Sequence, residues 1–242
     1  MLIVVLLLAA IKWPAAAQAQ GGAVTGAIQV LAGERPAPGK PGTANGAIWL
    51  TPVDTTTRDG DARRRPQPLR LRVVQQHKRF DPRIIVAPVG SVIEFPNLDP
   101  FFHNVFSLFD GKRFDLGLYQ AGTTHIVRFD RAGVCYVFCN IHPEMSAVVV
   151  IVDTPHYAIP DRTGEFSIPQ VPPGRYTVSV WHERCQPETL KEFSRQVTVT
   201  ESGAVLGTIR LTDSGDLLSR HKNKYGYDYE RPNPPGVLYE QP

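Results

Sequence analysis

The chain has 242 residues, of which 42% are hydrophobic, and it contains 22 prolines and 20 glycines. This length can bury an adequate core in one large or two small domains, and frequent Pro and Gly favour short strands joined by turns over long helices. The formal net charge of +3 is too small and too evenly spread to form a nucleic-acid-binding surface. Composition therefore argues against a nucleic-acid partner and predicts an all-β protein.

The N-terminus has the features of an export signal. The apolar stretch from Leu2 to Ile11 is too short to cross a bilayer comfortably, and Ala17-Gln18-Ala19 fits a small-x-small cleavage site. No Lys or Arg precedes the apolar stretch, which departs from the usual signal pattern. We expect residues 1–19 to be a signal peptide and the mature protein to be periplasmic or secreted, with no stable membrane span. The alternative is an uncleaved N-terminal anchor.

Strand-like patterns separated by turn residues continue to about residue 211. The expected strands are Val24–Leu31, Ala47–Val53, Leu69–Gln75, Arg83–Ala87, Ser91–Phe95, His103–Leu108, Thr124–Asp130, Val134–Cys139, Ala147–Asp153, Glu165–Ile168, Arg175–His182, Arg195–Thr200 and Ala204–Leu211. Only Pro187–Phe193 has a helical pattern, and residues 32–45 and 54–68 have the composition of long surface loops.

The expected strands divide into three groups. Residues 20–75 offer only a few strands, which rarely hold together without packing partners. Residues 154–211 offer a few more, whereas residues 76–153 look self-sufficient. We therefore expect the two outer segments to build one β-sandwich, with the middle segment inserted between them; the alternative is two domains in series. Residues 212–242 are expected to form an extended or disordered tail whose tyrosines could dock on the body.

The two outer segments carry motifs of a known β-sandwich family. The motifs are Val24-Thr25-Gly26, Ala47-Ile48-Trp49-Leu50, Gly164-Glu165-Phe166-Ser167-Ile168 and Pro172-Pro173-Gly174-Arg175-Tyr176-Thr177-Val178. They resemble the start and the end of a carboxypeptidase-regulatory-like (transthyretin-like) sandwich. The resemblance implies that both segments belong to one such domain.

The most informative motif closes the middle segment. Cys139, His142 and Met145 lie within seven residues, in a loop between an expected strand and a continuous apolar strand. A thiolate, an imidazole and a thioether suit copper and match calcium or magnesium poorly, because those ions take oxygen ligands. A trigonal copper site needs a second imidazole. His103, which opens an earlier strand, can supply it from another loop at the same end of the sandwich.

Residues Phe80 to Asp153 resemble the plastocyanin/amicyanin cupredoxins. The Cys-x-x-His-x-x-Met loop has the amicyanin spacing, and His103-Asn104-Val105 is similar to the upstream motif of that family. The resemblance implies a Greek-key sandwich with one type 1 (blue) copper, held by His103, Cys139 and His142 in one plane and by Met145 as a weak axial ligand. It also implies that Asn104 bonds the Cys139 sulfur through its backbone N–H and ties the two ligand loops together through its side chain.

We expect this protein to transfer electrons in the cell envelope, together with an unidentified redox partner protein, and not to be an enzyme. Copper oxidases and nitrite reductases hold further copper centres with His-x-His pairs, and the sequence has no such pair. Two alternatives remain open. One is a copper carrier or storage protein, and the other is an adhesive or ligand-binding sandwich with accessory copper.

The remaining cysteines and histidines need a separate interpretation. Cys135 and Cys139 are spaced one residue short of the pattern of a binuclear copper centre. Four residues of strand separate their Cα atoms by ~13 Å, too far for two bridging thiolates. We therefore expect one copper ion, with Cys135 inside the sandwich or paired with Cys185. The residues expected to lie outside the metal site are His182, at a strand end, and His77, His125, His156 and His221, at the surface.

Two phenylalanines beside His103 have two interpretations. Phe101 and Phe102 either belong to the core or form an apolar patch at the copper edge, where a redox partner docks.

Overall fold

The computed structural model describes residues 21–32, 35–36, 46–53, 67–108, 111–193, 195–215 and 221–229. The expected signal peptide and most of the two expected loops lie outside these ranges. Regular structure is almost entirely β-strand, and the helix α2 (Pro187–Glu192) matches the helical segment expected from the sequence. The all-β fold class is confirmed. Within the described ranges, no helix combines the length and the hydropathy that crossing a bilayer requires.

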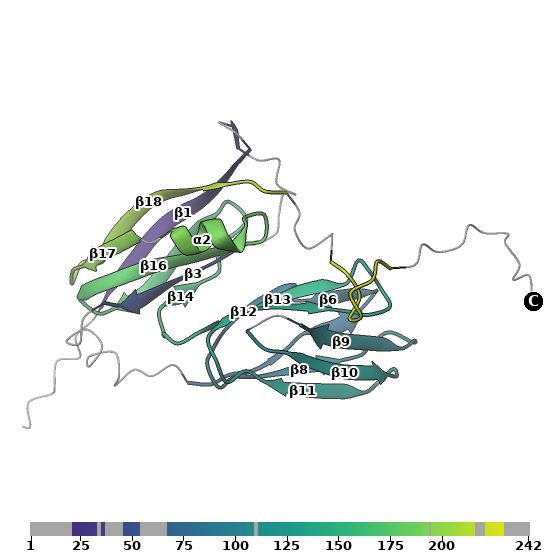
Figure 1. Cartoon of the computed structure of the whole chain (residues 1–242). Coiled ribbons are helices and arrows are strands. Elements are labelled where there is room, and N and C mark those ends of the chain that lie inside the picture. Colours follow the sequence, from purple (N-terminus) through teal and green to yellow (C-terminus); the bar gives the residue numbers. More distant parts are fainter. Residues whose placement is uncertain are drawn as a thin grey trace, which may run out of the picture.

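Strands from both ends of the chain form two sheets, which we call the outer sandwich (Figure 1). The first sheet has the order β15-β1-β18, with β2 paired to the end of β1, and the second has the order β14-β3-β16-β17. Their strands are β1 (Gly22–Ala32), β2 (Arg35–Pro36), β3 (Gly46–Pro52), β14 (Tyr157–Ala158), β15 (Glu165–Val171), β16 (Gly174–His182), β17 (Arg195–Val199) and β18 (Ala204–Thr212). The early strands β1 and β3 therefore pair with strands that follow residue 156.

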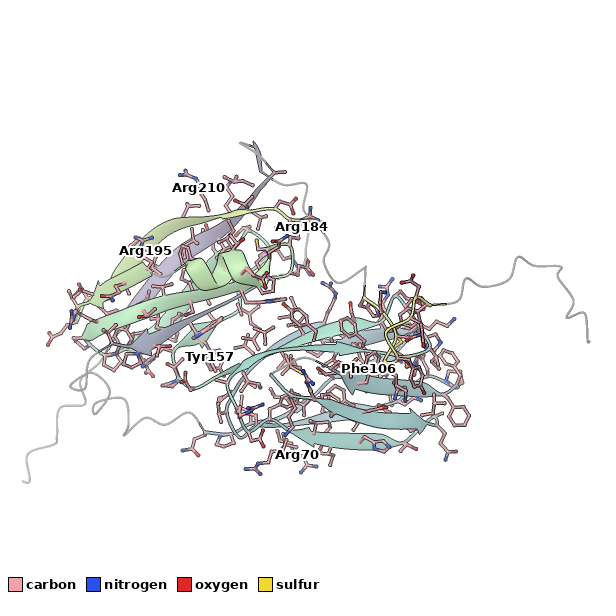
Figure 2. All side chains as sticks on the ribbon, viewed as in Figure 1. Arg70, Phe106, Tyr157, Arg184, Arg195 and Arg210 are labelled. Carbon is pink, nitrogen blue, oxygen red and sulfur yellow. The ribbon has the colours of Figure 1, made fainter. Side chains whose placement is uncertain are left out.

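The intervening residues form the inner sandwich. A five-stranded sheet has the order β10-β9-β12-β13-β7, a three-stranded sheet has the order β11-β8-β4, and β5 and β6 form a hairpin. The strands are β4 (Arg70–Arg72), β5 (Val74–Gln76), β6 (Arg79–Asp81), β7 (Ile84–Pro88), β8 (Val92–Pro96), β9 (His103–Ser107), β10 (Phe114–Tyr119), β11 (Thr124–Arg128), β12 (Gly133–Phe138) and β13 (Ser146–Val152). Figure 2 shows side chains filling the space between the layers, with Phe106 in the inner sandwich.

Alternation along β12 sends its side chains into two different cores. Cys135 and Val137 lie in the core of the inner sandwich, and Cys139, just after the strand, lies in the same core. Phe138 faces the opposite way, into the core that this five-stranded sheet shares with the outer sandwich. Because successive side chains of a strand point to opposite faces of the sheet, this alternation delivers the Cys139 thiol to the inner core.

The outer sandwich covers the second face of the five-stranded sheet. Trp181 Nε1 on β16 donates a hydrogen bond to the Tyr136 hydroxyl on β12 at 3.2 Å, and Arg83 forms an ion pair with Glu183. The apolar residues 147–152 of β13 are therefore buried from both sides. A strand covered on both faces has a continuous apolar sequence without alternation, which explains the pattern of β13.

The structure divides one expected strand and adds four strands that were not expected, β2, β6, β10 and β14. Val73 interrupts the expected strand Leu69–Gln75, which is divided into β4 and β5. Strand β10 was not expected, and it is irregular at Gly117. Gly117 has a φ of +69°, and the register against β9 shifts between Asp115 and Leu118. This β-bulge changes which side chains face inward, so that Tyr119 is buried and Leu118 is exposed.

Candidate metal centre

Three potential metal ligands converge at one end of the inner sandwich. His103 is the first residue of β9, Cys139 follows the last residue of β12, and His142 lies in the loop before β13. One donor atom from each residue lies within 4.8 Å of the others, and no further His, Cys, Asp or Glu of the described ranges joins this group. The three residues expected to lie in one plane around copper are thus brought together.

The distances between the donor atoms suit a single ion. Cys139 Sγ lies 3.7 Å from Nδ1 of His103 and 3.5 Å from Nδ1 of His142. A first-row ion at about 2.0 Å from nitrogen and about 2.3 Å from sulfur, bound at tetrahedral to trigonal angles, holds its donors about 3.5–3.7 Å apart. The donor set and its spacing therefore fit one copper or zinc ion, and the same nitrogen of each imidazole is turned toward the thiol.

The Cys139 sulfur lies in a shell of backbone donors. Its pKa is raised by burial, and hydrogen bonds from the backbone N–H groups of Asn104, Ile141 and His142 counteract this increase. These N–H groups favour the charged thiolate once its proton is displaced. The backbone N–H of Asn104, which we expected to bond this sulfur, is among the groups that lower the pKa of Cys139.

The side chain of Asn104 has a different role from the expected one. Its Nδ2 donates to Oδ1 of Asp115 at 2.7 Å and to the carbonyl of Gly117 at 2.8 Å. Instead of joining the two ligand loops, the side chain anchors β9 to the bulge of β10. The expectation failed because the sequence pattern did not reveal β10.

Asp99 is a supporting residue that the sequence reasoning missed. Its carboxylate lies 2.8 Å from Nε2 of His103 and accepts hydrogen bonds from the backbone N–H groups of His77 and Lys78. Because a carboxylate only accepts hydrogen bonds, Nε2 of His103 carries the proton and Nδ1 is free to bind a metal. A carboxylate four residues before the histidine was the available signal, but nothing in the sequence indicates that Asp99 is buried.

Met145 closes the loop. It is fully buried, its N–H donates to the carbonyl of His142 at 3.1 Å, and its carbonyl accepts the N–H of Cys139 at 3.2 Å. The loop is thus a closed turn whose ends are joined by backbone hydrogen bonds. Met145 lies in the same apolar core as Cys139, which is compatible with its expected role as a weak axial donor.

The exposed side of the centre is formed by His142 and apolar residues. His142 is partly exposed, and burial together with the nearby His103 lowers its pKa, so its imidazole is neutral and able to bind a metal at neutral pH. Phe101 packs against both histidine rings, with centroids 5.2 Å from His103 and 5.6 Å from His142. Leu98, Phe102 and Ile141 are also exposed. Of the two interpretations of Phe101 and Phe102, the structure favours the exposed patch.

The other thiols lie away from the centre. All three cysteines are free, so the suggested pairing of Cys135 with Cys185 is wrong. Cys135 is buried inside the sandwich, its Sγ donates to Ser107 Oγ at 3.2 Å, and burial raises its pKa to about 11. Cys135 also lies outside the group formed by His103, Cys139 and His142, so its position does not favour metal binding.

Of the four histidines expected at the surface, His77 is exposed, His125 and His221 are partly buried, and His156 is buried. His156 is buried and packs edge-on against Tyr176, with ring centroids 5.8 Å apart. His221 stacks on Phe138, the residue before Cys139, at 4.1 Å. By contrast, His182 is the last residue of β16, as expected.

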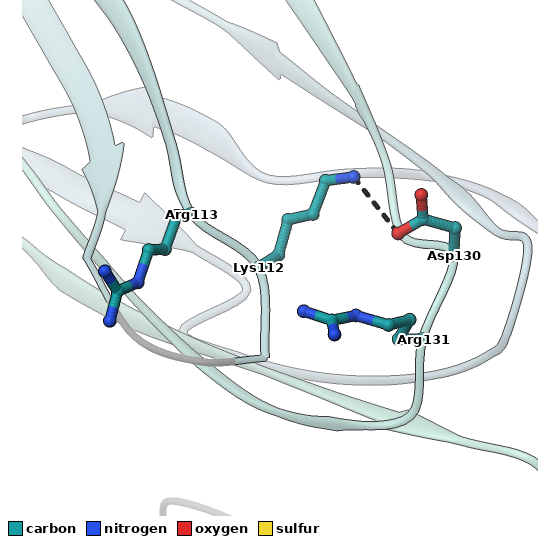
Figure 3. A pocket seen from close by; sticks show the side chains of 4 residues that line it. All are labelled: Lys112, Arg113, Asp130 and Arg131. Atoms are coloured by element: carbon teal, nitrogen blue, oxygen red, sulfur yellow. Dashed lines mark hydrogen bonds and ion pairs between the residues drawn. The ribbon is translucent and has the colours of Figure 1, made fainter.

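A surface depression lies near the start of β12, since Asp130 and Arg131 in its lining come shortly before Gly133, and Figure 3 shows the four side chains that line it. It has a volume of about 330 Å³ and is lined by Lys112, Arg113, Asp130 and Arg131, with Lys112 Nζ 3.1 Å from the Asp130 carboxylate. Lys112 also contacts Cys135 through its carbonyl. The depression is therefore separated from the metal centre by most of the length of β12, and it cannot bring a substrate to that centre.

Comparisons with known proteins identify partial structural neighbours. No protein-family profile and no curated protein sequence matches this chain. Among solved structures, a purple cupredoxin from Nitrosopumilus maritimus is 21% identical with a TM-score of 0.31, over 34% of this chain and 99% of that chain. Amicyanin from Paracoccus versutus is 20% identical with a TM-score of 0.31, over 34% and 80%.

A copper-containing nitrite reductase from Thermus scotoductus SA-01 is also similar. It is 22% identical with a TM-score of 0.34, over 42% of this chain, and only 27% of that chain is covered. The structural neighbours are thus cupredoxin-type proteins over part of the chain. Likeness at this level describes shape and assigns no activity, so the function is argued below from the residues of this chain.

Proposed function

We propose that the inner sandwich binds one copper ion through His103, Cys139 and His142, with Met145 as a fourth, weak donor. The observation that carries this proposal is the buried Cys139 sulfur, 3.5 Å and 3.7 Å from the two Nδ1 atoms. A set of two imidazoles and one thiolate, with a distant thioether, is the set that blue-copper electron-transfer sites use. Copper bound in this set supplies a one-electron redox couple.

The residues around the centre favour electron transfer over release of the metal. His103 is held by Asp99, and the sulfur of Cys139 is held by three backbone N–H groups. Donors that are held in place before the metal binds need little rearrangement when the oxidation state changes. A carrier needs donors that separate readily, and neither His103 nor Cys139 is exposed to a competing ligand.

The proposed route for electrons is the partly exposed edge of His142. Around it lie exposed apolar side chains, among them Phe101, Phe102 and Ile141, which are 37%, 55% and 43% exposed. Exposed apolar groups beside a buried functional centre are typical of protein docking sites. The partner we propose is a redox protein with an apolar face, met in the periplasm or outside the cell.

The test uses the chain from residue 20 onward, loaded with copper(II). We expect one ion per chain and an intense visible absorption from thiolate-to-copper charge transfer. Cys139→Ala should abolish that band and most of the affinity, because it removes the only anionic donor of the cluster. Tight copper binding without the band would contradict the blue-copper assignment, and preferential retention of zinc would contradict the redox role. Rapid loss of copper to a chelator would favour the carrier alternative.

A further inference from the structure

A segment from the C-terminal tail lies across the metal-binding end of the inner sandwich. Residues 221–229, which we call the strap, follow the outer sandwich in sequence and are drawn in yellow in Figure 1. Just before it, Asp213 is anchored to the outer sandwich by Arg184, with Arg184 Nη2 2.5 Å from the carboxylate. The chain is thus fixed to the outer sandwich at Asp213 and contacts the inner sandwich through the strap.

The strap contacts three consecutive residues around the cysteine ligand. The Tyr229 hydroxyl donates to the carbonyl of Cys139 at 2.8 Å. The backbone N–H of Lys224 donates to Oδ1 of Asn140 at 2.9 Å. As described above, the ring of His221 is stacked on Phe138, with an angle of 14° between the planes. The backbone at Cys139 is thus held from the outside, opposite to its buried thiol.

A second series of contacts connects Lys224 to the Cys139 sulfur through Asp115 and Asn104. Lys224 Nζ lies 2.7 Å from Oδ2 of Asp115, and Oδ1 of the same carboxylate accepts the Asn104 side chain at 2.7 Å. The backbone N–H of Asn104 in turn bonds the Cys139 sulfur. Burial raises the pKa of Asp115, but the bonds from Lys224 and Asn104 outweigh it and lower the pKa overall, so the carboxylate is charged. Lys224 is therefore linked to Cys139 by two routes, one through Asn140 and one through Asp115 and Asn104.

The strap has an ordered internal structure. Oδ1 of Asn223 accepts the N–H groups of Tyr225 and Tyr227, and the N–H of Asn223 donates to the Tyr227 carbonyl at 2.9 Å. This turn presents Lys224 and Tyr229 to the sandwich, while Tyr225 and Tyr227 are 68% and 70% exposed. A folded turn with directed contacts is a better restraint than a loose tail, because less conformational entropy opposes each bond.

We propose that the strap is a positioning element for the metal centre, in which Tyr229 and Lys224 hold the loop from Cys139 to Met145 in its binding geometry before copper arrives. The expected consequence of this restraint is slow release of copper, and this consequence rests on the proposed function. The restraint itself is a property of the copper-free chain.

The central experiment removes one hydroxyl group. Tyr229→Phe keeps the ring but deletes the bond to the Cys139 carbonyl, together with the bond inside the strap between the hydroxyl and Nε2 of His221 at 3.1 Å. Tyr227→Phe removes a hydroxyl from an exposed side chain. In copper-free protein, we expect the backbone amides of residues 139–142, 144 and 145 to exchange hydrogen about fivefold faster in Tyr229→Phe, the factor for the one ordinary hydrogen bond lost between the strap and the loop. Tyr227→Phe should match the wild type. In the loaded protein, copper transfer to a chelator should accelerate by a similar factor.

A second pair of variants tests the charged connection. Lys224→Met removes the ion pair with Asp115, and Lys224→Arg keeps it. We expect Lys224→Met to shift the thiolate-to-copper absorption and Lys224→Arg to restore the wild-type spectrum. A purely structural role for Lys224 would leave the spectrum of both variants unchanged.

The outcomes separate this inference from the proposed function. If the protein binds no copper, hydrogen exchange in the metal-free chain still decides the role of the strap. Equal exchange at residues 139–145 in Tyr229→Phe and Tyr227→Phe would overturn it. The inference would also fail if exchange in Tyr229→Phe rose equally in β3 of the outer sandwich, because that pattern indicates global destabilisation.

Discussion

Nε2 of His103 lies 2.8 Å from the carboxylate of Asp99, and both side chains are buried. Burial raises the pKa of Asp99, but hydrogen bonds from the Lys78 and His77 backbone and from His103 outweigh it, so the pKa is lowered overall. The carboxylate is therefore charged at neutral pH. It fixes the imidazole tautomer that directs Nδ1 toward Cys139, and it joins the β5–β6 hairpin to the metal centre.

This relationship predicts a loss of affinity in Asp99→Asn. Because the amide is neutral and one of its groups is a donor, it cannot accept all three hydrogen bonds or favour the same tautomer. We expect copper affinity to fall about 10- to 100-fold, measured by competition with a chelator of known affinity. The matched control is Asp153→Asn, at an exposed residue just after β13. Unchanged affinity in Asp99→Asn would show that the carboxylate only stabilises the hairpin.

Met145→Leu tests the fourth donor. The replacement conserves side-chain volume in a fully buried position, so the fold should tolerate it. We expect copper to remain bound and the reduction potential to rise, because a weak donor to copper(II) is lost. Protein-film voltammetry and the visible spectrum provide the measurement. If neither differs from the wild type, Met145 is a packing residue and not a ligand.

Cys135→Ser decides between one copper and two. Burial keeps the Cys135 thiol neutral, with its pKa raised to about 11, and the residue lies outside the three-residue cluster. We expect the variant to bind one copper ion and to keep the blue spectrum, whereas Cys139→Ser should lose the spectrum. The measurements are the copper content per chain and the visible absorption spectrum of the wild type and both variants. Two ions in the wild type and one in Cys135→Ser would establish a binuclear centre.

The pH dependence of stability should depend on His182. Burial, reinforced by the charge of Arg184, lowers its pKa to about 4, and its Nδ1 accepts the Arg184 N–H. The unfolded state, with an ordinary histidine pKa near 6.5, therefore binds more protons between pH 6.5 and 4. Stability should fall as pH decreases through this window, by up to about 3 kcal/mol at 1.36 kcal/mol per pKa unit.

His182→Asn should remove most of that slope, because the amide oxygen can accept the same bond without binding a proton. Urea unfolding of the copper-free protein at pH 7, 5.5 and 4 provides the measurement, with His77→Asn at an exposed position as the control. An equal slope in His182→Asn and the wild type would assign the acid sensitivity to other groups.

The inserted layout predicts that residues 20–75 do not fold alone. In the whole chain, β1 is hydrogen-bonded to β15 and β18, and β3 is hydrogen-bonded to β14 and β16. The fragment lacks all four of these partners, so its sheet edges and apolar faces remain uncovered. We expect no cooperative transition in thermal or urea unfolding. A cooperative transition would instead support two domains in series.

The local features of this protein follow from the sequence alone. Frequent turn residues and period-2 patterns predict the all-β class, and a short helical pattern predicts α2. Cys139, His142 and Met145 occupy one seven-residue loop, so chain connectivity by itself brings them close together. His103 could be added because its motif opens a strand of the same sandwich. These inferences succeed because the information lies within a few residues along the chain.

Only the tertiary structure decided what supports that loop. Asp99 reaches His103 because a loop buries it, and Tyr229 reaches Cys139 across 90 residues of sequence. Lys224 reaches Asp115 across 109 residues, on a strand that the sequence pattern did not reveal. Contacts between distant segments depend on how the two sandwiches pack and where the chain crosses between them. Hydrophobic periodicity predicts which face of a strand is buried, but it does not predict which distant residues pack on that face.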